Sequence, residues 1–169
     1  MDKTHIIGML VEDHAGVMTK IAGLFARRGY NIKTITVGNT HTPGISKIII
    51  SVKGDDKILE QIEKQCNKLI DVIKVSDLGK DDSIITEAGL IKVSIKNSKE
   101  KDDIIKYVDV YKNKIVDLTS KMVIIQVNGG PDKIDNFIEL MKPFGIKEVA
   151  RTGITAISRG NNGNGDKIN

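Results

Sequence analysis

Two stretches of the chain share one pattern of apolar and polar positions. "SKIIISVKGDDKI" begins at Ser46 and "SKMVIIQVNGGPDKI" begins at Ser120, so that Ile49 corresponds to Ile124. In both, a run of isoleucine and valine ends at glycine, and an acidic residue then opens a segment with apolar residues at three-and-four spacing. This pattern predicts a strand, a turn and a helix, and its recurrence predicts two similar units.

Extending the pattern in both directions gives six elements in each unit. The first unit is predicted to contain strands at 4–11, 31–38, 46–53 and 71–79, and helices at 17–28 and from 55 onward. The second is predicted to contain strands at 90–96, 114–118, 122–127 and 146–151, and helices at 101–112 and from 131 onward. The order strand, helix, strand, strand, helix, strand is that of the ferredoxin-like fold. The predicted class is therefore α+β, with two ferredoxin-like βαββαβ domains.

The predicted helices each carry one apolar stripe. The inward-facing residues of the helix at 17–28 are expected to be Val17, Met18, Ile21, Leu24 and Phe25. The stripe of the next helix consists of Ile58, Leu59, Ile62, Cys66, Leu69 and Ile70, and that of the last helix consists of Ile134, Phe137, Ile138 and Met141. Cys66 on such a stripe is expected to be a core residue.

Composition suggests where the domains begin and end. We expect a first domain at 1–78, a linker at 79–89 with the sequence "GKDDSIITEAG", a second domain at 90–160 and a disordered tail at 161–169.

The first predicted strand is apolar on both faces. Ile6 and Leu10 would lie on one face, and Ile7, Met9 and Val11 on the other. Helices cover only one face of such a sheet, so the second face is expected to be covered by a neighbouring domain or by a second copy of the chain. Symmetric dimers are the commonest oligomers, which favours the second copy.

Charge and cysteine content limit the possible environments and partners. The 169 residues include one cysteine, which excludes an internal disulfide, and the N-terminal sequence lacks the apolar run of a signal peptide or membrane span. We therefore expect a cytoplasmic protein that does not act in a membrane. The net charge of +4 arises from lysines and acids that alternate along the chain, and only 4% of residues are aromatic, so a nucleic-acid partner is not expected.

The loop that leads into the first predicted helix contains a candidate ligand site. Helix N-termini favour carboxylates, Gly16 permits close approach of the backbone, and Asp13 offers a negative group to an ammonium. Asn31 has both a donor and an acceptor and is placed to reach a ligand from a facing subunit. Together these residues suit an amino-acid zwitterion. In the alternative interpretation, Asp13 caps the helix, while Gly16 and Asn31 only shape turns; spacing alone leaves both open.

Catalytic and metal chemistry are not indicated by spacing. His5, His14 and His41 do not have the spacing of metal ligands, and no catalytic triad or carboxylate pair can be recognised. We accordingly predict no catalytic residues and no metal site. An acylphosphate-hydrolysing enzyme of the same fold would be expected to have an arginine in the loop "EDHAG", which has none.

Longer stretches resemble a known family. "GLFARRGYNI" and "LIDVIKVSDLG", together with "EVARTGITAISRG" near the C-terminus, are similar to the small, regulatory subunits of acetolactate synthase (acetohydroxyacid synthase). The resemblance covers nearly the whole chain and implies that the first unit is an ACT domain.

The resemblance also implies a function. Family members have no active site and no cofactor of their own; they bind a catalytic subunit that uses thiamine diphosphate, Mg²⁺ and FAD to make 2-acetolactate in valine, leucine and isoleucine synthesis. They activate it and, in many members, confer feedback inhibition by valine, which binds where the ACT domains of a homodimer meet. The effector residues implied here are Asp13, His14, Ala15, Gly16, Val17, Met18, Asn31 and Ile32.

One position departs from the family. Asparagine is common there where this chain has Asp13, and a fixed negative charge would either strengthen contact with an effector's ammonium or repel its carboxylate. This departure bears on the sensitivity to valine more than on the regulatory role. The alternative function is that of an ACT-type amino-acid sensor that serves a different enzyme.

Overall fold

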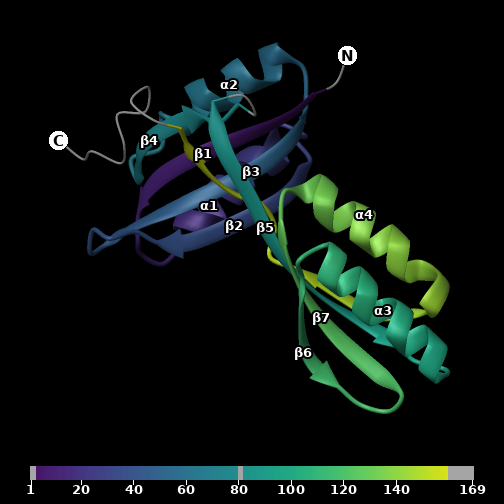
Figure 1. The fold of residues 1–169 in the computed structure, drawn as a ribbon. Coiled ribbons are helices and arrows are strands. Elements are labelled where there is room, and N and C mark those ends of the chain that lie inside the picture. The colour runs from purple at the N-terminus through teal and green to yellow at the C-terminus, as the bar shows by residue number, and fades with distance from the viewer. Residues whose placement is uncertain (1–2, 80–81, 160–169) are drawn as a thin grey trace. The chain divides into compact units, whose positions relative to one another are not determined.

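A computed structural model describes residues 3–79 and 82–159, which form two compact units (Figure 1). The first unit contains the described residues up to Ile85 together with those from Ile154 onward, and the second is Thr86–Gly153. The tail predicted at 161–169 lies outside the described residues.

The first unit has the predicted element order. Its elements are β1 (Lys3–Glu12), α1 (Val17–Arg27), β2 (Ile32–Asn39), β3 (Ile45–Gly54), α2 (Asp56–Cys66) and β4 (Val72–Asp77). The sheet order is β2-β3-β1-β4, and every neighbouring pair is antiparallel. Because β3 is antiparallel to both β1 and β2, these two strands run in the same direction. The ferredoxin-like prediction is confirmed for this unit.

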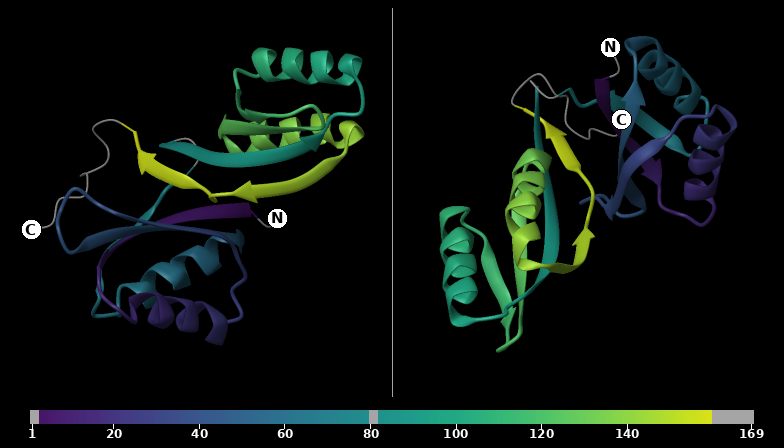
Figure 2. Two further views of the ribbon diagram at one scale, coloured as in Figure 1. Left: turned by 90° about the horizontal axis from the view of Figure 1, so that it is seen from below. Right: turned by 90° about the vertical axis from the view of Figure 1, so that its right-hand side faces the viewer.

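Both helices of the first unit pack on one face of its sheet (Figure 2). The core joins alternate residues of β1 and β3, such as Ile7, Met9 and Ile50, to the stripes of α1 and α2. Cys66 is buried in this core, as predicted. Met18 and Ile70 were wrongly predicted to face inward: Met18 lies at the margin of the α1 stripe, and Ile70, which is 89% exposed, belongs to a turn after α2 has ended.

The other face of β1 is covered by the same chain. Ile6 and Ile49 are buried with Leu78, Ile154 and Ala156, close to the short strand β9 (Thr155–Ser158). Gly8 leaves space for this contact, since an added Cβ would lie 2.8 Å from Leu78 Cδ1. The apolar second face of β1 is thus accounted for here without a second copy, and β9 is an element that the sequence analysis missed.

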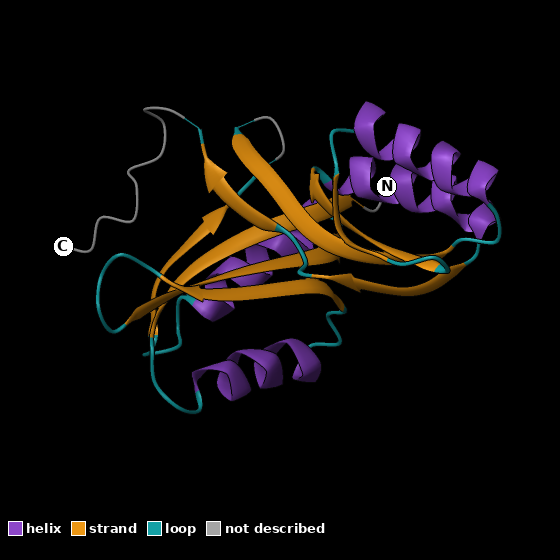
Figure 3. Cartoon of the chain, turned by 60° about the horizontal axis from the view of Figure 1, so that its bottom comes forward, coloured by secondary structure: helices purple, strands orange, loops and turns teal. Residues whose placement is uncertain are grey.

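The second unit repeats the fold. Its elements are β5 (Ser83–Ser94), α3 (Ser98–Val110), β6 (Lys114–Leu118), β7 (Met122–Gly129), α4 (Pro131–Met141), the 3₁₀ turn η1 (Lys142–Phe144) and β8 (Ile146–Arg151). The path β6-β7-β5-β8 forms the sheet, with β9 also paired to β5. Figure 3 shows α3 and α4 side by side on one face, and Phe137 and Ile104 lie in the core between helices and sheet.

Strand β5 begins earlier than predicted. Residues 83–89, which the composition suggested as part of a linker, belong to β5 and continue its alternation of buried and exposed positions. The buried positions in this part are Ser83, Glu87 and Gly89, which are not apolar side chains and therefore gave no strand pattern.

Candidate functional site

The loop between β1 and α1 ends at a helix N-terminus that has no side-chain cap. The N-cap residue is Gly16, and no side chain of the described residues accepts a hydrogen bond there. Asp13 is not the cap: its backbone N–H donates to the carbonyl of Gly44 at 2.8 Å, and its side chain is exposed. The N–H of Val17 donates to the carbonyl of His14 at 3.5 Å, and the N–H groups of Met18 and Thr19, which follow it in the first turn, are available to an anion.

Gly16 has the backbone conformation that favours glycine. Its φ is +93°, and an added Cβ would meet nothing within 4 Å. The loop is open on this side, with Ala15 and Gly16 both exposed and Met18 at 36% exposure. Val17 is different: only 3% of its surface is exposed, because it packs in the core. Among the implied effector residues in this loop, the side chain of Val17 is thus not accessible to a ligand.

The structure separates Asn31 from this loop within one chain. Asn31 is exposed and immediately precedes β2, and Ile32 pairs with Val52 of β3. Glu12, which begins the loop, pairs with Ile45 at the other end of β3. Seven residues of an antiparallel strand span about 24 Å. Within a single chain, the two halves of the predicted site therefore lie at opposite ends of the sheet.

A polar cluster that the sequence analysis missed adjoins the loop. His14 Nε2 lies 3.0 Å from Asp71 Oδ1 and 3.4 Å from Glu12 Oε2, and Lys20 Nζ donates to Asp71 Oδ2 at 2.6 Å. Asp71 is only 5% exposed. It comes from the segment before β4, 57 positions after His14, so no local spacing revealed it.

Hydrogen bonds and charges shift two pKa values in this cluster. The pKa of His14 is raised, chiefly by the hydrogen bond from its ring to the Ala15 carbonyl and further by Asp71, against some desolvation. The pKa of Asp71 is lowered, chiefly by the hydrogen bond from Lys20. The carboxylate is thereby held ionised beside the loop.

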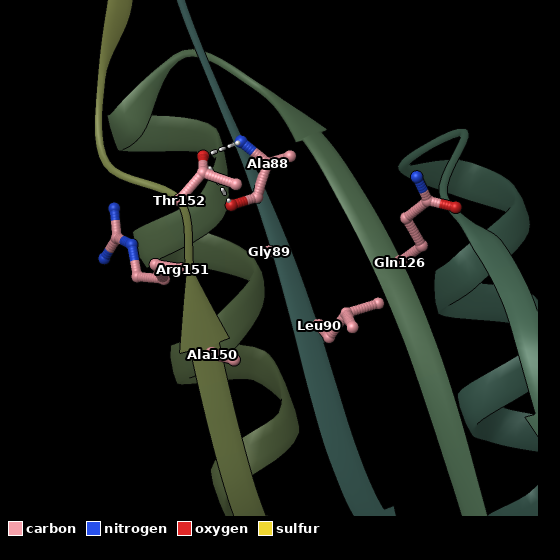
Figure 4. A pocket seen from close by; sticks show the side chains of 7 residues that line it. All are labelled: Ala88, Gly89, Leu90, Gln126, Ala150, Arg151 and Thr152. Carbon is pink, nitrogen blue, oxygen red and sulfur yellow. Dashed lines mark hydrogen bonds between the residues drawn. The ribbon is translucent and has the colours of Figure 1, made fainter. Parts of the chain in front are cut away.

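The second unit contains a hollow of about 300 Å³ on its sheet (Figure 4). Its lining residues are mostly small or apolar: Ala88, Gly89, Leu90, Gln126, Ala150, Arg151 and Thr152. Arg151 is bound by Glu87 through two 2.7 Å hydrogen bonds, and the Thr152 hydroxyl interacts with the backbone of Ala88. The groups that line this hollow suit an apolar contact better than an amino-acid zwitterion.

Among the described residues, no helix is long and apolar enough to cross a membrane.

Comparison with known proteins identifies related sequences over almost the whole chain. Residues 7–74 match the family model described as the AHAS small subunit-like ACT domain, and residues 86–160 match that described as the small subunit of acetolactate synthase. A probable acetolactate synthase small subunit from Methanothermobacter thermautotrophicus is 50% identical over 93% of this chain and 94% of its own length. The acetolactate synthase small subunit of Bacillus subtilis is 42% identical over 92% of this chain and 90% of its own.

A solved structure is similar to the same extent. The crystal structure of the acetolactate synthase small subunit from Thermotoga maritima superposes with a TM-score of 0.88 at 43% identity, covering 94% of this chain and 99% of that one. Both the sequence and the fold of these proteins are thus similar to those of this chain over both units.

Proposed function

The chain belongs to the family of acetolactate synthase small subunits, and we propose that it activates the catalytic subunit and confers feedback inhibition by valine. The observation that carries the effector assignment is the N-terminus of α1, which has no side-chain cap and opens to solvent at Gly16. A valine carboxylate would accept hydrogen bonds from the first-turn N–H groups of α1 and be favoured by the helix dipole.

The ammonium and the isopropyl group of valine would also contact residues of this loop. The exposed carboxylate of Asp13 offers an acceptor to the ammonium, and the exposed part of Met18 offers apolar contact to the isopropyl group. The negative charge of Asp13 therefore has a role when the ligand's ammonium, and not its carboxylate, points toward it.

The proposed site needs two copies of the chain. Asn31 lies about 24 Å from the loop of its own subunit along the strand direction, so it can only contact the same ligand if it comes from a partner. Strand β2, an edge of its sheet, carries the exposed apolar residues Ile35 and Val37. Burial of these residues would favour a homodimer through this edge.

In this proposal the chain is a regulator, and the catalytic subunit carries out the reaction. The catalytic subunit would carry thiamine diphosphate, Mg²⁺ and FAD and condense two molecules of pyruvate to 2-acetolactate and CO₂. Valine can lower the rate only if it binds the inhibited arrangement of the complex more tightly than the active one, and the coupling is reciprocal.

The test is the rate of acetolactate formation by the cognate catalytic subunit. We expect the rate to rise when this chain is added and to fall again with valine, and we expect Asn31→Ala to retain the rise but lose the response to valine. Asn136→Ala, an exposed asparagine of α4, is the matched control. A rise that valine does not reverse would remove valine as the effector. The absence of both a rise and a complex would refute the proposed function.

A further inference from the structure

We propose that Glu12, His14 and Asp71 form a binding site for Zn²⁺ beside the N-terminus of α1. Their ligand atoms, Glu12 Oε, His14 Nε2 and Asp71 Oδ1, all lie within 4.8 Å of one another. This inference does not depend on the proposed regulation of acetolactate synthase, and it departs from the prediction of no metal site that histidine spacing gave.

The orientation of the His14 ring carries the argument. Its Nδ1 lies 3.1 Å from the carbonyl oxygen of Ala15, which can only accept, so the proton of the neutral ring is on Nδ1. The lone pair of Nε2 then points toward two carboxylate oxygens, at 3.0 and 3.4 Å. Three acceptor atoms that face one another require a positive charge between them, either a second proton on the ring or a metal ion.

Surrounding bonds hold the ligands in place, as is usual for metal sites. Lys20 occupies the other oxygen of Asp71, Oδ2, and leaves Oδ1 for the site. The Ala15 carbonyl fixes the ring of His14 in the same way. The backbone N–H of Glu12 donates to the carbonyl of Asp71 at 2.9 Å, which ties together the two segments that provide the ligands.

The distances fit a zinc ion with one open position. Ligands at about 2.0–2.1 Å from tetrahedral zinc lie about 3.3 Å apart, close to the two distances measured from Nε2. The side chains of His14 and Glu12 are about half exposed, so a fourth position would face solvent. An imidazole with two carboxylates favours Zn²⁺ over Mg²⁺, which prefers oxygen ligands only.

The charges of the cluster also suit a divalent cation. With a neutral His14, the two carboxylates and the ammonium of Lys20 sum to one negative charge, and a bound Zn²⁺ would leave one positive charge next to the loop. This positive charge would add to the preference for anions that the N-terminus of α1 already has.

The experiment is a calorimetric titration of the chelator-treated full chain with ZnCl₂ near neutral pH, in the absence of valine and catalytic subunit. We expect one Zn²⁺ per chain, and affinity at least about tenfold weaker in both His14→Gln and Glu12→Gln. His41→Gln changes an exposed histidine outside the cluster and is expected to bind as the wild type does. Glu12→Gln alters an exposed side chain, so it decides the matter if His14→Gln fails to fold.

A spectroscopic measurement on the same proteins checks the ligands. Co²⁺ in place of Zn²⁺ should give visible absorption bands in the wild type that His14→Gln weakens or shifts. The inference is overturned if the wild type binds no Zn²⁺, if His41→Gln weakens binding as much as His14→Gln does, or if both cluster variants bind as tightly as the wild type. If the wild type binds no Zn²⁺, a second proton on the His14 ring accounts for the close approach of Nε2 to the two carboxylates.

Discussion

The separation of Asn31 from the Gly16 loop predicts complementation between two defective chains. In a symmetric dimer, each effector site would combine the loop of one chain with Asn31 of the other. A dimer of one Gly16→Asp chain and one Asn31→Ala chain would then contain one site with both defects and one site with none. Combining two variants that each bind the effector poorly should therefore restore effector binding.

Each single variant has a defined defect. In Gly16→Asp, the introduced side chain would project into open space, its carboxylate would repel that of valine, and the φ of +93° would cost about 1–2 kcal/mol. Loss of a hydrogen bond from Asn31 to a charged group is worth about 1.5–3 kcal/mol, which weakens binding about tenfold to a hundredfold.

In the assay, the two chains are co-expressed in equal amounts, and the resulting dimers are titrated with valine in a calorimeter. Random pairing makes about half of the dimers mixed, and about half of the sites in these are intact, so about a quarter of all sites should bind with wild-type affinity. Gly130→Asp paired with Asn136→Ala is the control: Gly130 also begins a helix without a side-chain cap and has open space at its Cβ. A mixture that binds no better than its two parents would refute a site shared between chains.

Three further results are expected from the structure. Cys66 is fully buried and burial raises its pKa to about 11, so at pH 8 about one thiol in a thousand is ionised and the native chain should react with Ellman's reagent only after unfolding; rapid reaction would contradict its core position. Arg151→Met leaves the buried Glu87 carboxylate without its two hydrogen bonds and should cost about 3–5 kcal/mol in urea unfolding, most of it recovered by adding Glu87→Leu; an unrecovered loss would count against the pair. Lys20 lowers the pKa of Asp71, so this contribution to stability is present above its unfolded pKa and is lost as pH falls through the folded one; Asp71→Asn should therefore show a shallower loss of stability below about pH 4 than the wild type, measured by circular dichroism.

The sequence predicted those elements whose buried positions are apolar. The stripe of α1 has the helical period, and the isoleucine runs of β3 and β7 end at glycines that begin helical segments, so both units could be located and their order deduced. The first part of β5 escaped because its buried positions hold Ser83 and Glu87, and the burial of Glu87 depends on Arg151, 64 positions later. Composition carries no signal for such a partner.

The candidate site was predictable only where it is continuous in sequence. The exposed loop around Gly16 was found because its features are helix-terminal ones. The contribution of Asp71 and Lys20 was not, since their 2.6 Å ion pair joins residues 51 positions apart. Nor could spacing show that Asn31 lies at the far end of its own sheet, because this follows from the parallel direction of β1 and β2.

The anchoring of the loop explains how events there can affect the rest of its unit. The backbone N–H of Asp13 donates to Gly44 in the turn between β2 and β3, and that of Glu12 donates to Asp71 just before β4. A ligand that moves the loop must therefore strain or break bonds to segments next to both edge strands, β2 and β4. Edge strands and their turns are the parts of a sheet that have backbone groups available to another chain. The loop is consequently connected, by two hydrogen bonds, to the segments next to both edge strands of its sheet.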